Sequence, residues 1–367
     1  MKKKLVSVLM CMAMGATLLA GCGSEEAADS SNTTAADAAD ADTAADSEAA
    51  DASDAADAAD AADGDVIKIG FAQVGHESDW RTASTNSAQS IFSAENGYDL
   101  QFVDCDQDSA VQLEAVRGFI EQDVDYIIID PIVSTGWDTV LTECEEAGIP
   151  VIVIDRTIDD SDKYISWVGS NFKNEGLAAG EWLKAYTDAK GISDVNVLVI
   201  EGTTGASAQI GRTDGFKEIA DANGWNILDS QTGDFTQAGG QEVMESYIKS
   251  YEGQFNVVVC QNDNEAYGAM DAMDAAGITY GVDGDVTLIS FDATHDGLQY
   301  TLDGKINCDV ECNPIQAETV KGVIEKMQAG EDYEKTTLVE DQAFVAPGIE
   351  SEYATTMTQE VLDGRAY

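Results

Sequence analysis

The sequence predicts an α/β protein built of two similar lobes, each with a parallel sheet covered by helices on both faces. From Val66 onward, short and nearly continuous apolar runs alternate with segments of helical length and period. Apolar strands of this kind are typical of parallel sheets that are buried on both faces. The alternation breaks near Ser170 and Asn171, and the break separates two sets of strands.

The expected strands are nine apolar runs. They cover residues 66–73, 100–104, 126–130, 151–155 and 165–169 in the first set, and 195–201, 227–231, 257–262 and 286–292 in the second. The segments between them carry apolar residues at helical spacing, such as Leu113, Val116, Phe119 and Ile120. Strands that alternate with helices predict a doubly wound order in each lobe.

The first 65 residues predict a targeting segment and a tether. Residues 1–21 have a basic start and an apolar stretch too short to span a bilayer, as in a signal peptide. Leu19-Ala20-Gly21-Cys22 resembles a bacterial lipobox, which implies cleavage before Cys22, lipidation of its thiol and anchoring to the cell membrane outside the cytoplasm. An ordinary signal peptide with a chance cysteine is the alternative.

The predicted tether covers residues 22–65. Residues 24–63 contain 13 acidic residues, no basic residue and no apolar side chain larger than alanine. A segment of this composition cannot bury enough apolar surface to offset its ordering entropy, so it is expected to be disordered. A helix is the alternative, because alanine is the best helix former.

Charge excludes nucleic acid as an expected partner. The chain has 69 Asp and Glu residues against 19 Lys and Arg residues, and its formal net charge of −50 repels phosphates. It has only two histidines, His76 and His295, in distant segments, so no histidine-built metal site is expected. The glycine-bearing stretch at residues 202–211 lacks both phosphate-binding patterns, and no cofactor is predicted.

Five cysteines fall in the predicted lobes: Cys105, Cys144, Cys260, Cys308 and Cys312. An odd number leaves at least one unpaired, and several lie in apolar runs, so buried thiols are favoured. In a regular strand Cys308 and Cys312 are roughly 13 Å apart, too far for a disulfide.

Polar side chains end most predicted strands, where open α/β sheets bind their ligands. They are Gln73, Asp104, Asp130, Asp155, Arg156, Glu201, Asn262, Asp263 and Asp292. Carboxylates, amides and guanidinium groups suit a sugar, since each hydroxyl both donates and accepts a hydrogen bond. Trp80 and Phe235, both in predicted loops, are candidates to cover the apolar face of a sugar ring. Asp and Asn are also common in turns, so any single position could have only that role.

From Lys68 to about Ala346 the sequence resembles the type I periplasmic sugar-binding proteins of ABC transporters. The resemblance is to the ribose-binding-like group in general and to its galactofuranose-binding branch in particular. The stretches that carry it are residues 70–75 with Trp80-Arg81, 115–119, 131–137, 153–156, 202–207 with Arg212, 230–235 with 242–246, and Asn262-Asp263.

The resemblance implies a set of ligand-binding residues. Its members are Ser78, Trp80, Arg81, Asp155, Arg156, Ser170, Arg212, Phe235, Asn262, Asp292 and Glu311. Two positions depart from the pattern. Asp130 stands where the galactofuranose branch has a small residue, and Cys312 stands where ribose-binding proteins have glutamine. Glu311 is expected to supply the polar group that Cys312 lacks.

The resemblance also implies two Rossmann-like lobes joined by a hinge of three crossovers. Residues 66–170 with 313–342 would form the N-terminal lobe, and residues 171–312 with 343–367 the C-terminal lobe. The implied protein is a monomer that binds a monosaccharide between its lobes and delivers it to the permease of an ABC importer. Presentation of the closed complex to a receptor or histidine-kinase ectodomain is the alternative.

Catalysis is not expected. Ser207 lies in Gly-Ala-Ser-Ala-Gln, which is not a nucleophile-elbow sequence. Asp155 and Asp292 could form the acid–base pair of a glycosidase, but the neighbouring arginines are expected to keep both carboxylates ionised. A transcriptional regulator is excluded by the signal segment and by the absence of a basic helix-turn-helix sequence.

Overall fold

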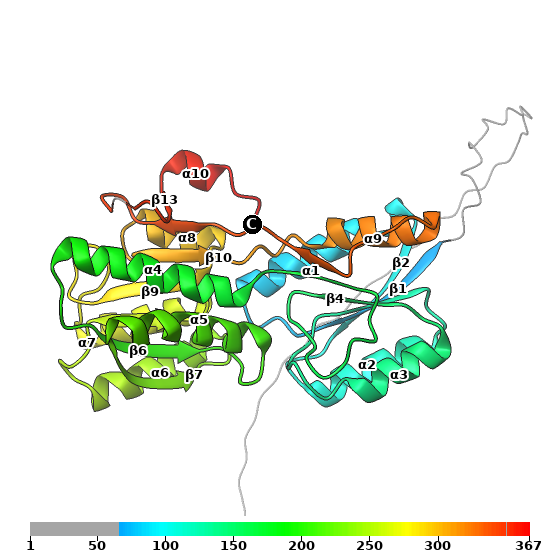
Figure 1. The fold of residues 1–367 in the computed structure, drawn as a ribbon, viewed down its shortest axis with the longest axis horizontal. Coiled ribbons are helices and arrows are strands. Elements are labelled where there is room, and N and C mark those ends of the chain that lie inside the picture. Colours follow the sequence, from blue (N-terminus) through cyan, green and yellow to red (C-terminus); the bar gives the residue numbers. More distant parts are fainter. Residues whose placement is uncertain (1–65, 350) are drawn as a thin grey trace, which may run out of the picture. The chain divides into compact units, whose positions relative to one another are not determined.

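The structure, a computed structural model, describes residues 66–349 and 351–367. The predicted signal peptide, lipidated Cys22 and tether lie outside these residues. The described chain folds into two α/β lobes, each built around its own sheet (Figure 1), and the predicted fold class is confirmed. None of the helices in this described part is long and apolar enough to cross a membrane.

The first lobe contains a six-stranded parallel sheet in the order β11-β5-β4-β3-β1-β2. The strands are β1 (Ile67–Gln73), β2 (Tyr98–Asp104), β3 (Tyr126–Ile129), β4 (Val151–Ile154), β5 (Ser166–Gly169) and β11 (Thr336–Leu338). The helices are α1 (Asp79–Ile91), α2 (Ser109–Glu121), α3 (Asp138–Ala147) and α9 (Ala317–Ala329), with a short 3-10 helix η1 (Ala94–Asn96).

The continuous apolar runs are explained by burial on both sheet faces. In β3, Ile127 and Ile129 pack into the core beneath α2 and α3, whereas Ile128 packs into the core beneath α1 and α9. Alternate side chains of a strand point to opposite faces, so a strand covered on both sides needs apolar residues at every position. Helix α9 follows the second lobe in sequence but packs beside α1 (Figure 1).

The second lobe contains a seven-stranded sheet in the order β13-β12-β10-β9-β8-β6-β7. The strands are β6 (Asn196–Glu201), β7 (Asn226–Thr232), β8 (Val257–Cys260), β9 (Thr287–Asp292), β10 (Cys308–Glu311), β12 (Ala343–Val345) and β13 (Thr355–Thr356). Only β12 runs antiparallel to its neighbour β10. The helices are α4 (Phe172–Lys190), α5 (Ser207–Asn223), α6 (Gln237–Ser250), α7 (Asp263–Ala276), α8 (His295–Leu302) and α10 (Gln359–Asp363).

Three short segments connect the lobes: one between β5 and α4, one between β10 and α9, and one between β11 and β12. Asp341 in the third segment ties all three together. Its Oδ1 atom accepts a hydrogen bond from Ser170 Oγ at 3.0 Å and from the Asn313 N–H at 3.1 Å. These segments are the three crossovers that are expected to form the hinge between the lobes.

All five cysteines of the described residues are buried and unpaired, as predicted. Burial raises the pKa of each thiol, as it does to about 12 for Cys105.

Helices α4 and α5 pack closely because glycines line their contact. A Cβ atom added to Gly215 would lie 2.2 Å from the Lys173 carbonyl oxygen, and one added to Gly176 would lie 2.3 Å from the Arg212 carbonyl oxygen. Both neighbours are backbone atoms, so side-chain rotation cannot relieve the overlap.

Substitution of Gly215 by alanine is therefore expected to lower the free energy of unfolding by roughly 2 kcal/mol or more. Gly322 in α9 provides the control, because a Cβ atom there would meet nothing within 4 Å. Gly322→Ala is expected to stabilise the protein by about 0.5–1 kcal/mol, since alanine loses less backbone entropy in a helix. Urea denaturation measures both changes; equal effects at the two positions would contradict the close-packing explanation.

Candidate functional site

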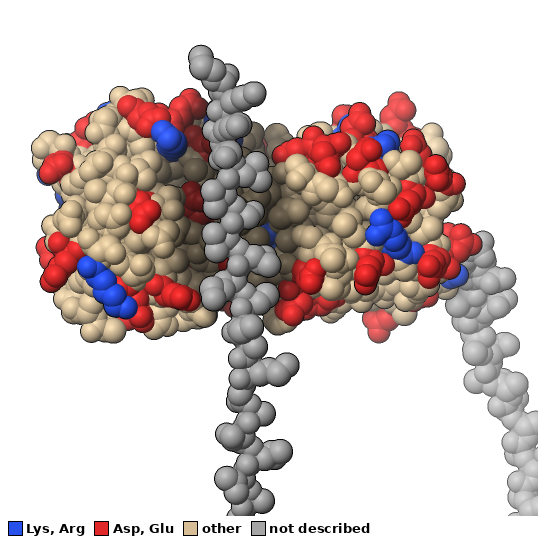
Figure 2. All heavy atoms as spheres, turned by 90° about the horizontal axis from the view of Figure 1, so that it is seen from below, with Lys and Arg blue, Asp and Glu red and all other residues tan. Residues whose placement is uncertain are grey.

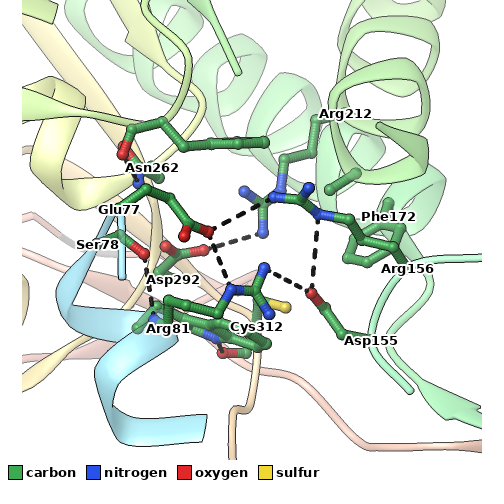
Figure 3. A pocket seen from close by; sticks show the side chains of 13 residues that line it. Glu77, Ser78, Arg81, Asp155, Arg156, Phe172, Arg212, Asn262, Asp292 and Cys312 are labelled. Carbon is green, nitrogen blue, oxygen red and sulfur yellow. Dashed lines mark hydrogen bonds and ion pairs between the residues drawn. The ribbon is translucent and has the colours of Figure 1, made fainter. Parts of the chain in front are cut away.

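A small cavity lies between the lobes. Its lining comes from both lobes and from the second connecting segment, and it comprises Glu77, Ser78, Trp80, Arg81, Asp155, Arg156, Phe172, Ala208, Arg212, Phe235, Asn262, Asp292 and Cys312. Figure 3 shows guanidinium and carboxylate groups from the two lobes facing the same space. The cavity thus joins the carboxyl ends of β4, β8 and β9.

Nine of the eleven predicted site residues line this cavity. The structure does not bring Ser170 or Glu311 to it. Ser170 bonds to Asp341 in the hinge, and Glu311 accepts hydrogen bonds from the Gln342 N–H, the Arg365 guanidinium and the Tyr367 hydroxyl. Glu311 therefore fixes the carboxyl-terminal residues, while the adjacent Cys312 lines the cavity that Glu311 was expected to reach.

Four lining residues were not among the predicted set: Glu77, Phe172, Ala208 and Cys312. Trp80 lies in the first turn of α1 and not in a loop as predicted. Glu77 directly precedes Ser78, the N-cap of this helix, so the segment pointed to the site without identifying this carboxylate. Phe172 follows the first crossover directly, and Ala208 follows Ser207 at the start of α5. Neither apolar residue carries a local sequence signal for ligand contact.

In the first lobe, Arg81 organises three buried carboxylates. Its guanidinium donates to Glu77 Oε1 at 2.9 Å, to Asp155 Oδ2 at 3.2 Å and to Asp130. Burial raises the pKa of Asp130, and Arg81 opposes this shift. Asp130, which replaces the small residue expected from the family pattern, does not line the cavity. Its carboxylate lies behind Arg81 and holds the guanidinium in place.

Arg156 is the second buried cation of this lobe. It donates from Nη1 to the Ile132 carbonyl oxygen at 3.0 Å, and its Nη2 lies 3.8 Å from Glu77 Oε1. Arg156 Nε and Glu77 Oε2 are buried and have no hydrogen-bond partner among the described residues. Arg156 Nε is a donor and Glu77 Oε2 is an acceptor. A hydroxyl group, which both accepts and donates a hydrogen bond, can satisfy a pair of this kind.

In the second lobe, Arg212 has a comparable role. It donates from Nε to Glu175 Oε2 at 2.7 Å, from Nη2 to Asp292 Oδ1 at 3.0 Å, and also to the Gln261 carbonyl oxygen. Its guanidinium lies 5.0 Å from the ring centre of Phe291. Burial lowers the pKa of Arg212, but Glu175 and Asp292 outweigh it and raise the pKa well above its ordinary value.

Burial raises the pKa of Asp292 to about 7, with Arg212 opposing the shift. The expectation that a neighbouring arginine keeps Asp292 fully ionised is therefore wrong. Burial also raises the pKa of Glu175 to about 8. The physical reason is that a single guanidinium serves both carboxylates, and neither has access to water.

Several site residues are also helix caps. Asn262 caps α7 by accepting from the Glu265 N–H at 2.8 Å, and it donates to the Phe235 carbonyl oxygen at 2.9 Å. Ser78 caps α1 by accepting from the Arg81 N–H at 3.1 Å. Capping fixes both polar side chains at helix starts that open into the cavity.

The aromatic side chains close the cavity. Trp80 and Phe235 come from different lobes and pack in one cluster with Phe172 and Cys312. Trp80 Nε1 donates to the Cys312 carbonyl oxygen at 2.5 Å. The Arg156 guanidinium lies 5.1 Å from the ring centre of Phe235.

Direct hydrogen bonds also join the lobes around the cavity. The Asp79 N–H donates to Asn264 Oδ1 at 2.9 Å, and the Thr157 N–H donates to Ser207 Oγ at 2.8 Å. The cavity is therefore a charged space between two lobes that touch. Across residues 66–349 and 351–367, no group of three or more His, Cys, Asp or Glu side chains could hold a metal ion.

Comparison with known proteins adds independent information. A family model described as "Periplasmic binding protein domain" matches residues 69–320. The chain is 39% identical over 285 residues to the galactofuranose-binding protein YtfQ of Escherichia coli K12, a match that covers 76% of this chain and 88% of that protein.

Two solved structures show similar folds. A protein from Mycobacterium smegmatis in complex with β-D-fucofuranose is 44% identical, with a TM-score of 0.72, and the match covers 76% of this chain and 91% of that one. The periplasmic binding protein of the arabinose ABC transporter from Shewanella sp. ANA-3, bound to α- and β-L-arabinofuranose, is 37% identical, with a TM-score of 0.71. That match covers 76% of this chain and 92% of the other.

Proposed function

Because the chain belongs to the periplasmic-binding-protein family, we propose that it is the monosaccharide-binding component of an ABC importer, with galactofuranose, galactose or a related aldose as its ligand. The family consists of solute-binding proteins, so the expectation of a binding protein rather than an enzyme is confirmed. On the face seen in Figure 2 acidic residues are spread over both lobes, consistent with the absence of nucleic acid from the expected partners.

The observation that carries the proposal is an unpaired buried acceptor and an unpaired buried donor on residues that line the cavity. Glu77 Oε2 is an unpaired buried acceptor and Arg156 Nε an unpaired buried donor, and Asp292 and Asn262 face them from the other lobe. A ring hydroxyl can satisfy a donor and an acceptor at once. Trp80 and Phe235 add the apolar surfaces that the C–H faces of a sugar ring need.

The furanose form is favoured by the relatives. Two similar structures contain fucofuranose and arabinofuranose, and the curated relative at 39% identity is a galactofuranose-binding protein.

Calorimetric titration with D-galactose, D-fucose, L-arabinose, D-ribose and D-fructose tests the proposal. At least one aldose is expected to bind, and saturation at 100 times its dissociation constant should stabilise the protein by about 2.7 kcal/mol in thermal unfolding. If no monosaccharide binds but an amino acid or peptide does, the proposed ligand class is wrong.

Asp292→Ala is expected to weaken sugar binding by roughly 2 kcal/mol or more, about thirtyfold, because it removes a carboxylate that lines the cavity and leaves Arg212 Nη2 without its acceptor. Asp214→Ala is the matched control, since Asp214 is exposed on the same helix as Arg212. The control should bind as tightly as the unchanged protein. Equal affinity in both variants, with folding intact, would remove Asp292 from the ligand site.

The divided cavity also predicts a movement. Trp80 and Asp155 belong to one lobe and Arg212 and Asn262 to the other, so the ligand contacts are complete only when the lobes close. Sugar is therefore expected to lower the radius of gyration in solution scattering, with the hinge segments absorbing the rotation. An unchanged radius at saturation would contradict closure even if binding is confirmed.

Delivery to a permease is the role that fits a closed, ligand-dependent surface. Sugar-dependent stimulation of a reconstituted permease and its ATPase would support delivery, whereas sugar-dependent binding to a kinase ectodomain would support sensing. Anchoring through Cys22 is tested separately by mass spectrometry of the mature protein. Cys22→Ser is expected to release the protein from the membrane fraction without altering sugar affinity.

A further inference from the structure

Asp292 ends β9 and faces the cavity, and the turn begins at this residue in an unfavourable backbone conformation. Asp292 and Ala293 have φ values of 102° and 52°, and neither is glycine. Non-glycine residues in such regions cost of order 1–3 kcal/mol each and persist only where the surroundings hold them. The orientation of the Asp292 carboxylate therefore depends on whatever fixes this turn.

Two buried carboxyl groups fix it. Asp309 Oδ1, on the neighbouring strand β10, accepts from the Ala293 N–H at 3.1 Å. Asp263 Oδ2, at the start of α7, accepts from the Thr294 N–H at 2.8 Å and from Thr294 Oγ1 at 2.7 Å. Asp263 and Asp309 are both fully buried, so no water competes for these bonds.

The hydrogen-bond pattern distinguishes the two carboxyl groups. Asp263 also accepts from Ser290 Oγ at 2.6 Å, so donors already surround both of its oxygens. Asp309 Oδ2 receives no donor among the described residues. The two side chains shift each other's pKa, because Asp309 lowers the pKa of Asp263 and Asp263 raises the pKa of Asp309. Asp309 is thus the acid that donates, and Asp263 is the carboxylate that accepts.

The charges around the pair favour this assignment. Burial raises the pKa of Asp309, and Asp263 and Asp292 raise it further. Tyr267 on α7, Cys260 on β8 and Cys308 on β10 also face the pair, and all three are neutral at pH 7 because burial raises the pKa of each. The cation Arg212 bonds to Asp292 rather than to either member of the pair.

We propose that Asp263 and Asp309 are a positioning pair, which shares one proton and holds the turn that aims Asp292 at the sugar. The pair lies behind the cavity wall and does not line the cavity. This role rests on the proposed sugar-binding function, so the test includes a measurement on the unliganded protein.

Three variants separate the roles of the two acids. Asp309→Asn is expected to bind sugar within twofold of the unchanged protein, since its amide can donate to Asp263 while its carbonyl oxygen accepts from Ala293. Asp309→Ala loses both bonds and should bind at least tenfold more weakly. Asp263→Asn should also lose at least tenfold, because an amide donor would face the Ser290 and Thr294 donors.

A pH series gives a second, independent readout. The pKa of folded Asp309 is raised above its unfolded value, so its stabilising contribution is complete below pH about 4 and is lost as the pH rises through the folded pKa. Unfolding measurements should therefore show the unchanged protein losing stability relative to Asp309→Asn as the pH rises. The affinity for D-galactose, or for whichever aldose the calorimetric screen identifies, should follow stability. As the pH rises, the affinity of the unchanged protein should fall relative to that of Asp309→Asn.

Hydrogen exchange of the Ala293 and Thr294 amides, measured without sugar, tests the turn itself. Both amides should stay protected in Asp309→Asn and lose protection in Asp309→Ala. If Asp309→Asn and Asp309→Ala lose protection alike, or if Asp309→Ala loses stability but keeps full affinity, the positioning role is wrong. The two proposals can also fail separately. If no sugar binds the unchanged protein but the amides are protected in Asp309→Asn and not in Asp309→Ala, the proposed function is wrong, whereas Asp263 and Asp309 still hold the turn.

Discussion

Arg212→Ala is expected to abolish measurable sugar binding and to lower the free energy of unfolding by about 3–5 kcal/mol at neutral pH. The guanidinium lies between Glu175 and Asp292, and both carboxylates are buried. Without it, two acidic groups and the Gln261 carbonyl oxygen lose their donor inside the protein. Calorimetric titration and urea denaturation measure the two effects.

The loss of stability in Arg212→Ala should depend on pH. Burial already raises the pKa of Glu175 to about 8 and of Asp292 to about 7, and Arg212 lowers both values, so its removal raises them further. Groups with raised pKa contribute stability that is complete below pH about 4 and is lost as the pH rises through the folded pKa. The deficit should therefore be small near pH 5 and large above pH 8.

Arg117→Ala is the matched control for charge. Arg117 pairs with Glu143 at 2.7 Å, but both side chains are substantially exposed, at 43% and 38%. Exposed pairs contribute at most about 1 kcal/mol, so this variant should keep its sugar affinity and nearly all its stability. A similar loss in both variants would mean that the effect of Arg212 does not depend on its burial.

Trp80→Ala is expected to weaken sugar binding about a hundredfold, equivalent to about 2.7 kcal/mol. The indole is 3% exposed and packs against Phe235 and Phe172 of the other lobe. Its removal takes away an apolar wall of the cavity and the hydrogen bond to the Cys312 carbonyl oxygen. Trp80→Phe keeps much of the apolar wall and loses only the indole donor. Its affinity should therefore lie between that of the unchanged protein and that of Trp80→Ala.

Trp225 provides the tryptophan control. It packs against Phe216 within the second lobe, with ring centres 5.9 Å apart, and does not line the interlobe cavity. Trp225→Ala should lower stability while leaving the affinity unchanged. If Trp80→Ala lowers stability but not affinity, as expected of Trp225→Ala, Trp80 is a packing residue and not a wall of the sugar site.

The family resemblance pointed to nine residues of the cavity lining, and the sequence alone determined the α/β class and the nine strands β1 to β9. These features have local signals: apolar runs bounded by turns, helical spacing between them, and polar residues where strands end. Trp80 and Asn262 could be singled out because the loop or helix start that holds them follows a strand directly. Strands β12 and β13 are only three and two residues long; β12 pairs with β10 and β13 pairs with β12, so they carry no pattern of their own.

Only the tertiary structure decided how polar side chains pair over long distances in sequence. Ser170 bonds to Asp341 across 171 positions and Glu311 to Tyr367 across 56, which takes both away from the cavity. The depth of burial is equally invisible in the sequence, where the fully buried Asp309 looks like any of the 69 acidic residues. Hydrophobic period is a property of neighbouring residues, whereas the pKa and partners of a buried carboxyl group depend on every element packed around it.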